Sequence, residues 1–562
     1  MNTLDNMPTP GWLSWFLKGT LLVVAIILFA RLAELQIIKG QYYHDLSDNN
    51  RIRTIPIIAA RGKILGSDGQ ALVGNIPIKE KIIFTKEGFK KDLNIDGANP
   101  NEFTAGGPQA SLIIETKRNY FLGAAAAHVT GYLAKVNKDE VNKIDPNCPD
   151  KGTRLPESLI GRSGLEEEYD CILRGIDGEE LIEVDAAGNP VRILGIRNPI
   201  AGQDLVTTIN TGLQQKVASV VNTLKITTST GTNLPDDRRG AVVITDGNGK
   251  VLAMYSAPSY DPNAFINGNA SQINSIVNNS SLPLFNRDID GLYHPGSTFK
   301  IVTSTAALEE KKIDENFTFN DQGFITLNGY TYNNWNWSEF GKVEREVNLT
   351  RAIARSTDTF FYKVGEKVGI SDLSSWANKF GLNKNTGIDL PNEAKGLIPD
   401  PAWKRQAKGE LWFLGDTYNV AIGQGDVVLT PVAANTLASV IANNGKVCTP
   451  HINSSIKDNC INLNLQEKNI DLIKEGMIEA CSTGGTGFPF FDFNPKVACK
   501  TGTAETGDNG KTHAWFAAFA PSDNPKIVID VIIEKGGQGS EVAAPIAKEI
   551  LNYYFNKQSS TK

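Results

Sequence analysis

One apolar stretch near the N-terminus constrains the fold more strongly than any other part of the sequence. Between Leu13 and Ala30 only four residues are not apolar, namely Ser14, Lys18, Gly19 and Thr20. This length and composition are typical of a helix that crosses a membrane once. We therefore predict a membrane-attached protein, in which Lys18 extends its amine toward the membrane interface.

A signal peptide is the alternative interpretation of the same stretch. Its uninterrupted apolar core, Leu21 to Ala30, is short enough for such a peptide. However, no Ala-x-Ala-like cleavage site follows, and residues 31–39 continue in a helical pattern. We therefore predict an uncleaved transmembrane anchor at residues 12–33, after a cytoplasmic tail at residues 1–11. Charge counting alone does not support this orientation, because more basic residues follow the span than precede it.

The remaining composition is that of an ordinary folded protein. The chain has 562 residues, of which 41% are hydrophobic and 8% aromatic, which suffices for about two to four domains and at least one large core. Its net charge is −6, and it contains no dense run of Lys and Arg. These features argue against binding to nucleic acids.

The cysteines and histidines give weaker signals. Six cysteines form an even number that disulfides outside the cytoplasm could use completely, and Cys448 with Cys460 is the most plausible local pair. Six unrelated thiols explain the count equally well. The five histidines are scattered, and no His or Cys cluster has the spacing of metal ligands. We therefore predict no metal site and no cofactor.

Residues 34–200 predict a mixed α/β module with a structural role. Residues 61–72 alternate in polarity around an Asp-Gly pair and predict a β-hairpin, and residues 183–190 resemble a second hairpin. No nucleophile is paired with a base in this segment. His128 lies among alanines and a valine, and is expected to be a structural histidine rather than a ligand.

Residues 201–556 predict a larger α+β domain. A clear hairpin pattern at residues 240–255 precedes a mainly helical region that ends near residue 490. Three further strand patterns and a closing helix follow, at residues 496–505, 513–520, 527–533 and 542–555. We expect one antiparallel sheet flanked by helices, a separate helical lobe, and a ligand groove between sheet and lobe.

A hydroxyl and an amine lie one helical turn apart at Ser297 and Lys300. They follow a Pro-Gly turn and open an apolar helical run, so Ser297 is expected in the first turn of a buried helix. The free N–H groups there favour an oxyanion, and Lys300 lies on the same helix face. The pair predicts a serine nucleophile with its base beside it. The same spacing recurs at Ser454/Lys457 and at Ser559/Lys562, so alone it more often marks a solvated helix face.

Two further motifs accompany this pair in a fixed order. Lys500-Thr501-Gly502 occurs once and lies in a strand pattern, where an edge strand could bind an extended peptide and the lysine its carboxylate. Gly502 would let the ligand approach the backbone. The motif Ser-x-Asn/Asp occurs four times, but only Ser356-Thr-Asp358 lies between the other two motifs. The ordered triple is the joint signature of class A β-lactamases and penicillin-binding proteins.

The sequence therefore resembles the class B penicillin-binding proteins, the monofunctional peptidoglycan D,D-transpeptidases, and within them the elongation-type penicillin-binding protein 2 group. The resemblance covers almost the whole chain. Besides the anchor it rests on Arg61-Gly62, Gly161-x-Ser-Gly-Leu-Glu, Tyr293-His-Pro-Gly-Ser-Thr-Phe-Lys, Gly415-Asp-Thr-x-Asn, Ile422-Gly-Gln-Gly425 with Thr430-Pro431, and Lys500-Thr-Gly-Thr-Ala-Glu505. Asp358 departs from the common Asn, and its carboxylate would favour the charged forms of the nearby lysines.

The resemblance implies an anchor, an elongated pedestal (dimerisation-type) module at residues 34–200, a penicillin-binding/β-lactamase-like transpeptidase domain at 201–556 and a tail at 557–562. It also implies that Ser297 attacks a D-alanyl-D-alanine stem peptide after Lys300 takes its proton, and that an amine of a second peptide resolves the acyl-enzyme. The implied catalytic residues are Ser297, Lys300, Ser356, Asp358, Lys500 and Thr503, with Ser297 and Thr503 N–H groups as the oxyanion hole. The implied substrate-binding residues are Lys500, Thr501, Gly502 and Thr503.

The resemblance further implies where the protein acts and with what. It places the chain in the cytoplasmic (inner) membrane with its catalytic domain on the periplasmic side, where it serves cell-wall elongation and cell shape. β-Lactam antibiotics would acylate Ser297. A SEDS-type, RodA-like glycosyltransferase and other elongation-complex proteins would be partners, binding the anchor and the pedestal.

Other functions are compatible with parts of this pattern. A D,D-carboxypeptidase differs only in letting water reach the acyl-enzyme, and a division-type transpeptidase has the same motifs. A serine β-lactamase or β-lactam sensor leaves the anchor unexplained, and no Glu-x-x-x-Asn lies between Asp358 and Lys500. An inactive scaffold is disfavoured because all three motifs are intact.

Overall fold

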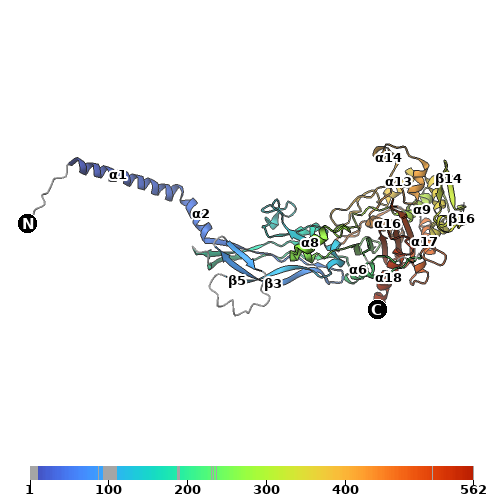
Figure 1. Cartoon of the computed structure of the whole chain (residues 1–562), viewed down its shortest axis with the longest axis horizontal. Coiled ribbons are helices and arrows are strands. Elements are labelled where there is room, and N and C mark those ends of the chain that lie inside the picture. Colours follow the sequence, from blue (N-terminus) through green and yellow to red (C-terminus); the bar gives the residue numbers. More distant parts are fainter. Residues whose placement is uncertain are drawn as a thin grey trace, which may run out of the picture. The chain divides into compact units, whose positions relative to one another are not determined.

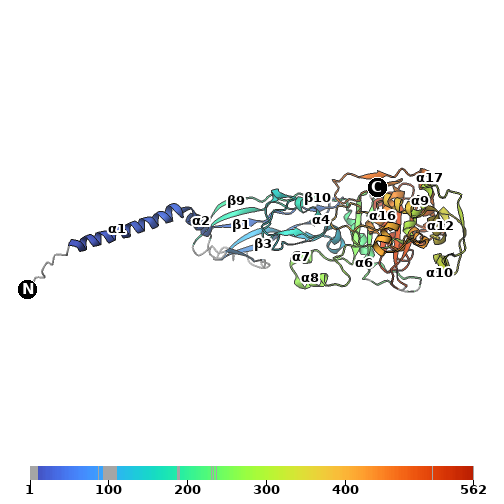
Figure 2. The same cartoon turned by 90° about the horizontal axis from the view of Figure 1, so that it is seen from above.

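The computed structural model describes residues 11–85, 88–92, 110–185, 190–229, 231, 233–235, 237–508 and 510–560. The chain forms two compact units (Figures 1 and 2). The first unit comprises Met1–Ala60, Pro77–Lys117 and Gly175–Ala201, and the second comprises Arg61–Ile76, Arg118–Arg174 and Gly202–Lys562. The predicted domain boundaries at residues 33/34, 200/201 and 556/557 stay predictions. Most of the predicted N-terminal tail, and Lys562 of the third Ser-x-x-Lys match, lie outside the described residues.

The first unit begins with the predicted apolar helix. The helix α1 (Gly11–Ala33) continues through a π-helical turn (Glu34–Ile38) and is followed by α2 (Gly40–Arg51). The segment Gly11–Ile38 contains an 18-residue stretch with a mean hydropathy of 2.3 and is long enough to cross a membrane. The chain therefore carries one N-terminal helix with the properties of a single-pass anchor.

A three-stranded sheet follows in the first unit. Its strands β1 (Ile52–Ile57), β8 (Gly178–Val184) and β9 (Pro190–Arg197) pair antiparallel in that order. Strands β8 and β9 are the hairpin predicted around residues 183–190, although residues 186–189 lie outside the description. In a second sheet, the long strand β3 (Ala71–Thr85) pairs with β4 (Gly88–Asp92) and with β5 (Ala110–Tyr120).

The first residues of the second unit are held by a buried ionic network. Glu166 accepts hydrogen bonds from Arg61 Nε (2.6 Å) and Arg118 Nε (2.8 Å), and Asp170 pairs with Arg61 and Arg154. These side chains are nearly excluded from solvent, so removal of one partner would leave an uncompensated buried charge. The network gives a structural role to Arg61 of the Arg61-Gly62 motif and to Glu166 of the Gly161-x-Ser-Gly-Leu-Glu motif. The hairpin predicted at residues 61–72 is also present, because Ile64 pairs with Val73 in an antiparallel ladder.

The core of the second unit is a five-stranded antiparallel sheet. Its order is β12 (Val251–Ala257), β11 (Gly240–Thr245), β21 (Ile527–Ile533), β20 (Thr512–Ala520) and β19 (Ala498–Glu505). The prediction that three late strands continue the earlier hairpin is confirmed. The helices α6 (Thr211–Thr223) and α18 (Ala543–Ser560) pack on one face, and α16 (Pro431–Ala442) packs on the other. The predicted α+β class is thus confirmed.

A helical lobe surrounds α9 (Lys300–Glu309) and shares one hydrophobic core with α16. Its other main helices are α11 (Leu349–Arg355), α12 (Asp358–Val368), α13 (Ile370–Lys379), α14 (Pro401–Lys408), α15 (Leu414–Ala421) and α17 (Glu467–Ala480). Short elements complete the unit: β2 (Ile64–Leu65), β6 (Leu133–Lys135), β7 (Leu159–Gly161), β10 (Leu205–Val206), β13 (Thr318–Asp321), β14 (Phe324–Leu327), β15 (Tyr330–Asn333), β16 (Arg345–Asn348), β17 (Lys446–Cys448), β18 (Cys460–Asn462), α3 (Ala127–Thr130), α4 (Gly164–Glu168), α5 (Asp170–Leu173), α7 (Asn263–Asn267), α8 (Ala270–Val277) and α10 (Trp335–Phe340).

All six cysteines form disulfides. The predicted pair Cys448–Cys460 is confirmed, because strands β17 and β18 place these residues directly opposite each other. The other two bonds are Cys148–Cys171 and Cys481–Cys499. The fold brings these four residues together, and no spacing rule in the sequence identified them.

His128 has the structural role that was predicted. Its ring is buried, and Nε2 lies 2.8 Å from the carbonyl oxygen of Pro283. Burial lowers the pKa of His128 to about 4, so the ring is neutral at physiological pH.

Candidate active site

A tight turn places Ser297 at the start of α9. Residues Gly296–Phe299 form a 3₁₀ turn that leads directly into α9, so Ser297 lies in the first turn of a buried helix, as predicted. In a 3₁₀ turn, residues i and i+3 are eclipsed, which puts Ser297 and Lys300 on one face. Ser297 is half-buried, whereas Lys300 is fully buried. The hydroxyl thus remains accessible while the amine is shielded from water.

The Ser356 hydroxyl joins the other two motifs. Lys300 Nζ donates to Ser356 Oγ (3.1 Å) and to the Ser356 carbonyl oxygen (2.8 Å). Lys500 Nζ donates to the same Ser356 Oγ at 2.9 Å. The structure therefore brings together residues that are distant in the sequence, and a hydroxyl between two amines can pass a proton in either direction.

The segment around Ser356 changes direction sharply. Ser356 ends α11 in the left-handed region (φ 55°), and α12 begins two residues later at Asp358. Asp358 Oδ1 accepts a hydrogen bond from Lys300 Nζ at 2.7 Å, and Oδ2 accepts one from the Trp335 N–H at 3.0 Å. The Asp358 N–H in turn donates to Asn334 Oδ1. The carboxylate is therefore held from two sides and orients the lysine.

Burial has the largest effect on the pKa of Lys300 and of Lys500. We expected the Asp358 carboxylate to favour their charged forms, and it does raise the pKa of both. Full burial opposes it and prevails, so the pKa of Lys300 is lowered. The pKa of Lys500 is lowered well below its usual value, by burial and by the charge of Lys300. The carboxylate thus acts as expected, and the opposing effect of burial was not foreseen because the sequence shows the nearby carboxylate but not the loss of hydration.

Strand β19 brings the Lys-Thr-Gly motif against the turn that carries Ser297. It forms one edge of the described sheet, as predicted. A Cβ atom on Gly502 would lie 3.1 Å from Thr298 Cγ2 and 3.2 Å from the Pro295 carbonyl oxygen, so only glycine permits this approach. Thr503 is exposed, and a Cβ atom on Gly296 would lie 2.9 Å from its carbonyl oxygen. Ser297 and Thr503 therefore lie on adjoining segments.

Thr501 has a hydrogen-bond partner that we did not predict. Its side chain is buried, and its Oγ1 donates to Thr486 Oγ1 at 2.7 Å. Gln424 was also missed as a site residue, although its Nε2 lies 3.4 Å from the Thr503 carbonyl oxygen. The Gly-Gln-Gly stretch around it was part of the family resemblance and could have suggested it. Nothing in the sequence pattern singled out Thr486 or Trp335.

The other Ser-x-x-Lys match inside the description lies elsewhere in the fold. Ser454 Oγ donates to the Val206 carbonyl oxygen at 2.8 Å. One group of possible metal ligands occurs among the described residues, formed by Asp145, Cys148 and Cys171. Its two sulfur atoms belong to a disulfide, so no thiolate is available there. The expectation of no metal stays a prediction.

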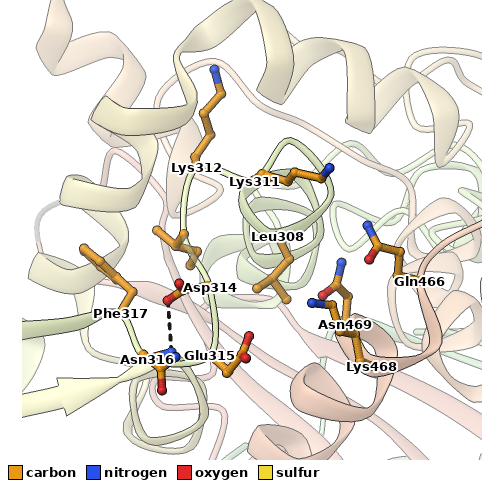
Figure 3. A pocket seen from close by; sticks show the side chains of 11 residues that line it. Leu308, Lys311, Lys312, Asp314, Glu315, Asn316, Phe317, Gln466, Lys468 and Asn469 are labelled. Carbon is orange, nitrogen blue, oxygen red and sulfur yellow. Dashed lines mark hydrogen bonds between the residues drawn. The ribbon is translucent and has the colours of Figure 1, made fainter.

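A hollow of about 460 Å³ lies at the opposite end of α9 from Ser297 (Figure 3). Leu308 forms part of its wall, together with the following loop and the start of α17. Lys311, Lys312 and Lys468 line it beside Asp314 and Glu315. Its lining contains none of the predicted site residues, so the predicted chemistry does not belong there. The predicted groove between sheet and lobe stays a prediction.

Comparison with known proteins agrees with this geometry. Residues 240–552 match the family described as Penicillin binding protein transpeptidase domain, and residues 101–207 match the Penicillin-binding Protein dimerisation domain. The peptidoglycan D,D-transpeptidase MrdA of Haemophilus influenzae is 32% identical, over 96% of this chain and 90% of the relative. The chain belongs to the penicillin-binding protein transpeptidase family.

Solved penicillin-binding proteins share its fold over nearly the whole length. PBP2 of Helicobacter pylori, solved in complex with MreC, is 25% identical with a TM-score of 0.76, covering 90% of this chain and 99% of that one. A chain from a peptidoglycan synthase complex is 28% identical with a TM-score of 0.74, covering 97% and 98%. The order along the chain of an N-terminal apolar helix, a dimerisation domain and a transpeptidase domain is therefore that of a penicillin-binding protein 2.

Proposed function

We propose that this transpeptidase cross-links peptidoglycan stem peptides through an acyl-enzyme on Ser297. One observation carries the proposal: the Ser356 hydroxyl lies between the amines of Lys300 and Lys500, beside the turn that presents Ser297. The half-buried Ser297 thus lies beside a buried network that offers a base and a proton relay.

In the first half-reaction, neutral Lys300 accepts the Ser297 proton while the serine oxygen attacks the penultimate D-Ala carbonyl. The N–H groups of Ser297 and Thr503 stabilise the oxyanion that develops. When the C–N bond breaks, the proton reaches the leaving D-Ala through Ser356. Asp358 keeps Lys300 in position throughout. An amine of a second stem peptide then attacks the ester, forms the cross-link and regenerates the serine.

The terminal carboxylate of the donor would bind at the Lys-Thr-Gly-Thr segment. Lys500, Thr501 and Thr503 can supply donors to it, and Gly502 lets this segment lie close to the turn that carries Ser297. The same contacts would hold the carboxylate of a β-lactam, which would acylate Ser297 by the same route. The inhibited enzyme would be an acyl-enzyme that no amine resolves.

We infer that the chain acts in cell-wall elongation on the periplasmic side of the membrane. Three disulfides support an oxidising compartment for the second unit. The two solved relatives, one with MreC and one in a peptidoglycan synthase complex, support elongation-complex partners. Within such a complex we propose a RodA-like SEDS glycosyltransferase that contacts the anchor and the pedestal.

Product analysis tests the reaction. The purified full-length protein, given a stem-peptide donor ending in D-Ala-D-Ala and an amine acceptor, is expected to release D-Ala and to form the cross-linked peptide. Mass spectrometry measures both products. Release of D-Ala with only the trimmed donor would identify a D,D-carboxypeptidase instead. Absence of D-Ala release would contradict acyl transfer to this donor.

The pH dependence of acylation tests the role of Lys300. The base must be neutral, so the rate rises as the pH rises through the Lys300 pKa. The Asp358 carboxylate raises this pKa against the effect of burial, and Asp358→Asn removes the charge but keeps an acceptor of similar shape. Its loss lowers the pKa of Lys300, and of Lys500 in the same direction. We expect the rising limb of the acylation rate with fluorescent penicillin to move to lower pH. An unchanged limb, or a shift to higher pH, would contradict this role.

A further inference from the structure

Thr486 connects two walls of the proposed site. It lies in the short Gly-rich loop, residues 482–487, between the end of α17 and strand β19. Its N–H donates to the Ala354 carbonyl oxygen at 3.2 Å, two residues before Ser356. Its hydroxyl shares a hydrogen bond with Thr501 at 2.7 Å. Thr486 therefore links the segment of the proton relay to the strand that would bind the substrate carboxylate.

The surrounding loop leaves Thr486 little freedom. The Gly487 N–H donates to the Ala480 carbonyl oxygen at 2.7 Å, which folds the loop back onto the end of α17. A Cβ atom on Gly487 would lie 2.8 Å from both Cys481 Sγ and Cys499 Sγ, so the loop passes directly over the buried disulfide. That bond ties the residue after α17 to the residue before Lys500. The Cys481–Cys499 disulfide, called the brace below, thus holds the loop that carries Thr486 against the strand that carries Thr501.

Because both partners are hydroxyls, either Thr486 or Thr501 can be the donor in this contact. Each hydroxyl has one proton and two acceptor lone pairs, and the proton rotates to suit its partners. Without substrate, the two hydroxyls share one hydrogen bond of 2.7 Å. When a carboxylate binds, Thr501 can donate its proton to it while it accepts a hydrogen bond from Thr486. Such a chain strengthens the final bond to the anion.

We propose that Thr486 is a positioning residue for the terminal carboxylate of the substrate, acting through Thr501 and held in place by the Cys481–Cys499 disulfide. This inference rests on the proposed function, because it assigns the carboxylate to the Lys-Thr-Gly-Thr segment. Thr486 does not touch the reacting atoms. Its effect is expected only on ligands that carry the carboxylate.

The test compares a penicillin with its methyl ester, which lacks the negative charge. Thr486→Val keeps the shape but removes the hydroxyl, and Thr486→Ser keeps the hydroxyl. For Thr486→Val we expect the acylation rate constant for the free acid to fall by up to about tenfold, the size expected for loss of one neutral hydrogen bond, while that for the ester is unchanged. Thr486→Ser should behave like the wild type. Thr483→Val is the matched control, since Thr483 is an exposed hydroxyl in the same loop.

Several outcomes would overturn the inference. If Thr486→Val slows acid and ester equally, or slows neither, Thr486 has no role at the carboxylate. A second test concerns the brace and leaves Thr486 unaltered. The double variant Cys481→Ala/Cys499→Ala should lose selectivity for the acid over the ester, as Thr486→Val does. Unchanged selectivity in that folded variant would refute the brace. Failure of the proposed function is distinct, because the wild type would then not be acylated by the free acid at Ser297.

Discussion

Replacement of Ser297 by alanine is expected to abolish covalent labelling by a fluorescent penicillin. The label forms an ester with the serine oxygen. The other hydroxyl of the 3₁₀ turn, that of Thr298, is buried and donates to the Pro295 carbonyl oxygen, so it is not available for acylation. The remaining side chains can still bind the drug, but they cannot form the bond. Fluorescence of the denatured protein on a gel measures only this covalent fraction, so the expected signal is zero.

The chain supplies a matched control for this experiment. Ser454 has the same spacing to a lysine, at Lys457, but its hydroxyl donates to the backbone of Val206 away from the network. Ser454→Ala should therefore label like the wild type. Labelling that persists in Ser297→Ala, or that disappears in Ser454→Ala, would contradict the assignment of the nucleophile.

The sequence predicted those parts of the site whose chemistry is local. Ser297 and Lys300 are one turn apart, so a helical pattern suffices to place them on one face. Lys500, Thr501 and Gly502 are consecutive, and their strand pattern predicted an extended segment that could bind a peptide. The order of the three motifs then indicated a known family, and the family implied that they meet. The contact itself is tertiary, since Ser356 Oγ bonds to amines far away in the sequence.

What the sequence did not predict depends on burial and on distant backbone contacts. The lowered pKa of Lys300 follows from its complete desolvation, which no motif reveals. Thr486 lies in a loop and Trp335 begins α10, and tertiary packing determines that both reach the site. The bond Cys448–Cys460 could be predicted because a hairpin joins its ends, whereas Cys481–Cys499 requires α17 and β19 to be placed first.

Removal of the Lys300 amine is expected to have the second largest effect. Lys300→Met fills a similar volume without a base, and a positioned base typically contributes about 10²–10⁴-fold to a proton transfer. We expect the acylation rate constant with fluorescent penicillin to fall by roughly this factor. The variant also leaves Asp358 without its cation, although the Trp335 N–H still donates to the carboxylate. Some loss of stability is therefore expected as well, and a denaturant unfolding curve measures it separately.

A second buried lysine separates the two effects. Lys404 is 6% exposed, and its Nζ pairs with Asp416 at 2.8 Å and with Glu410 at 3.4 Å. Both partners are more exposed than Asp358, so Lys404→Met should reduce stability less than Lys300→Met, and it should leave the acylation rate of the folded protein unchanged. If both variants lose acylation in proportion to their loss of stability, Lys300 is only a structural cation. If Lys300→Met loses acylation while it remains folded and Lys404→Met does not, the amine acts on the Ser297 proton.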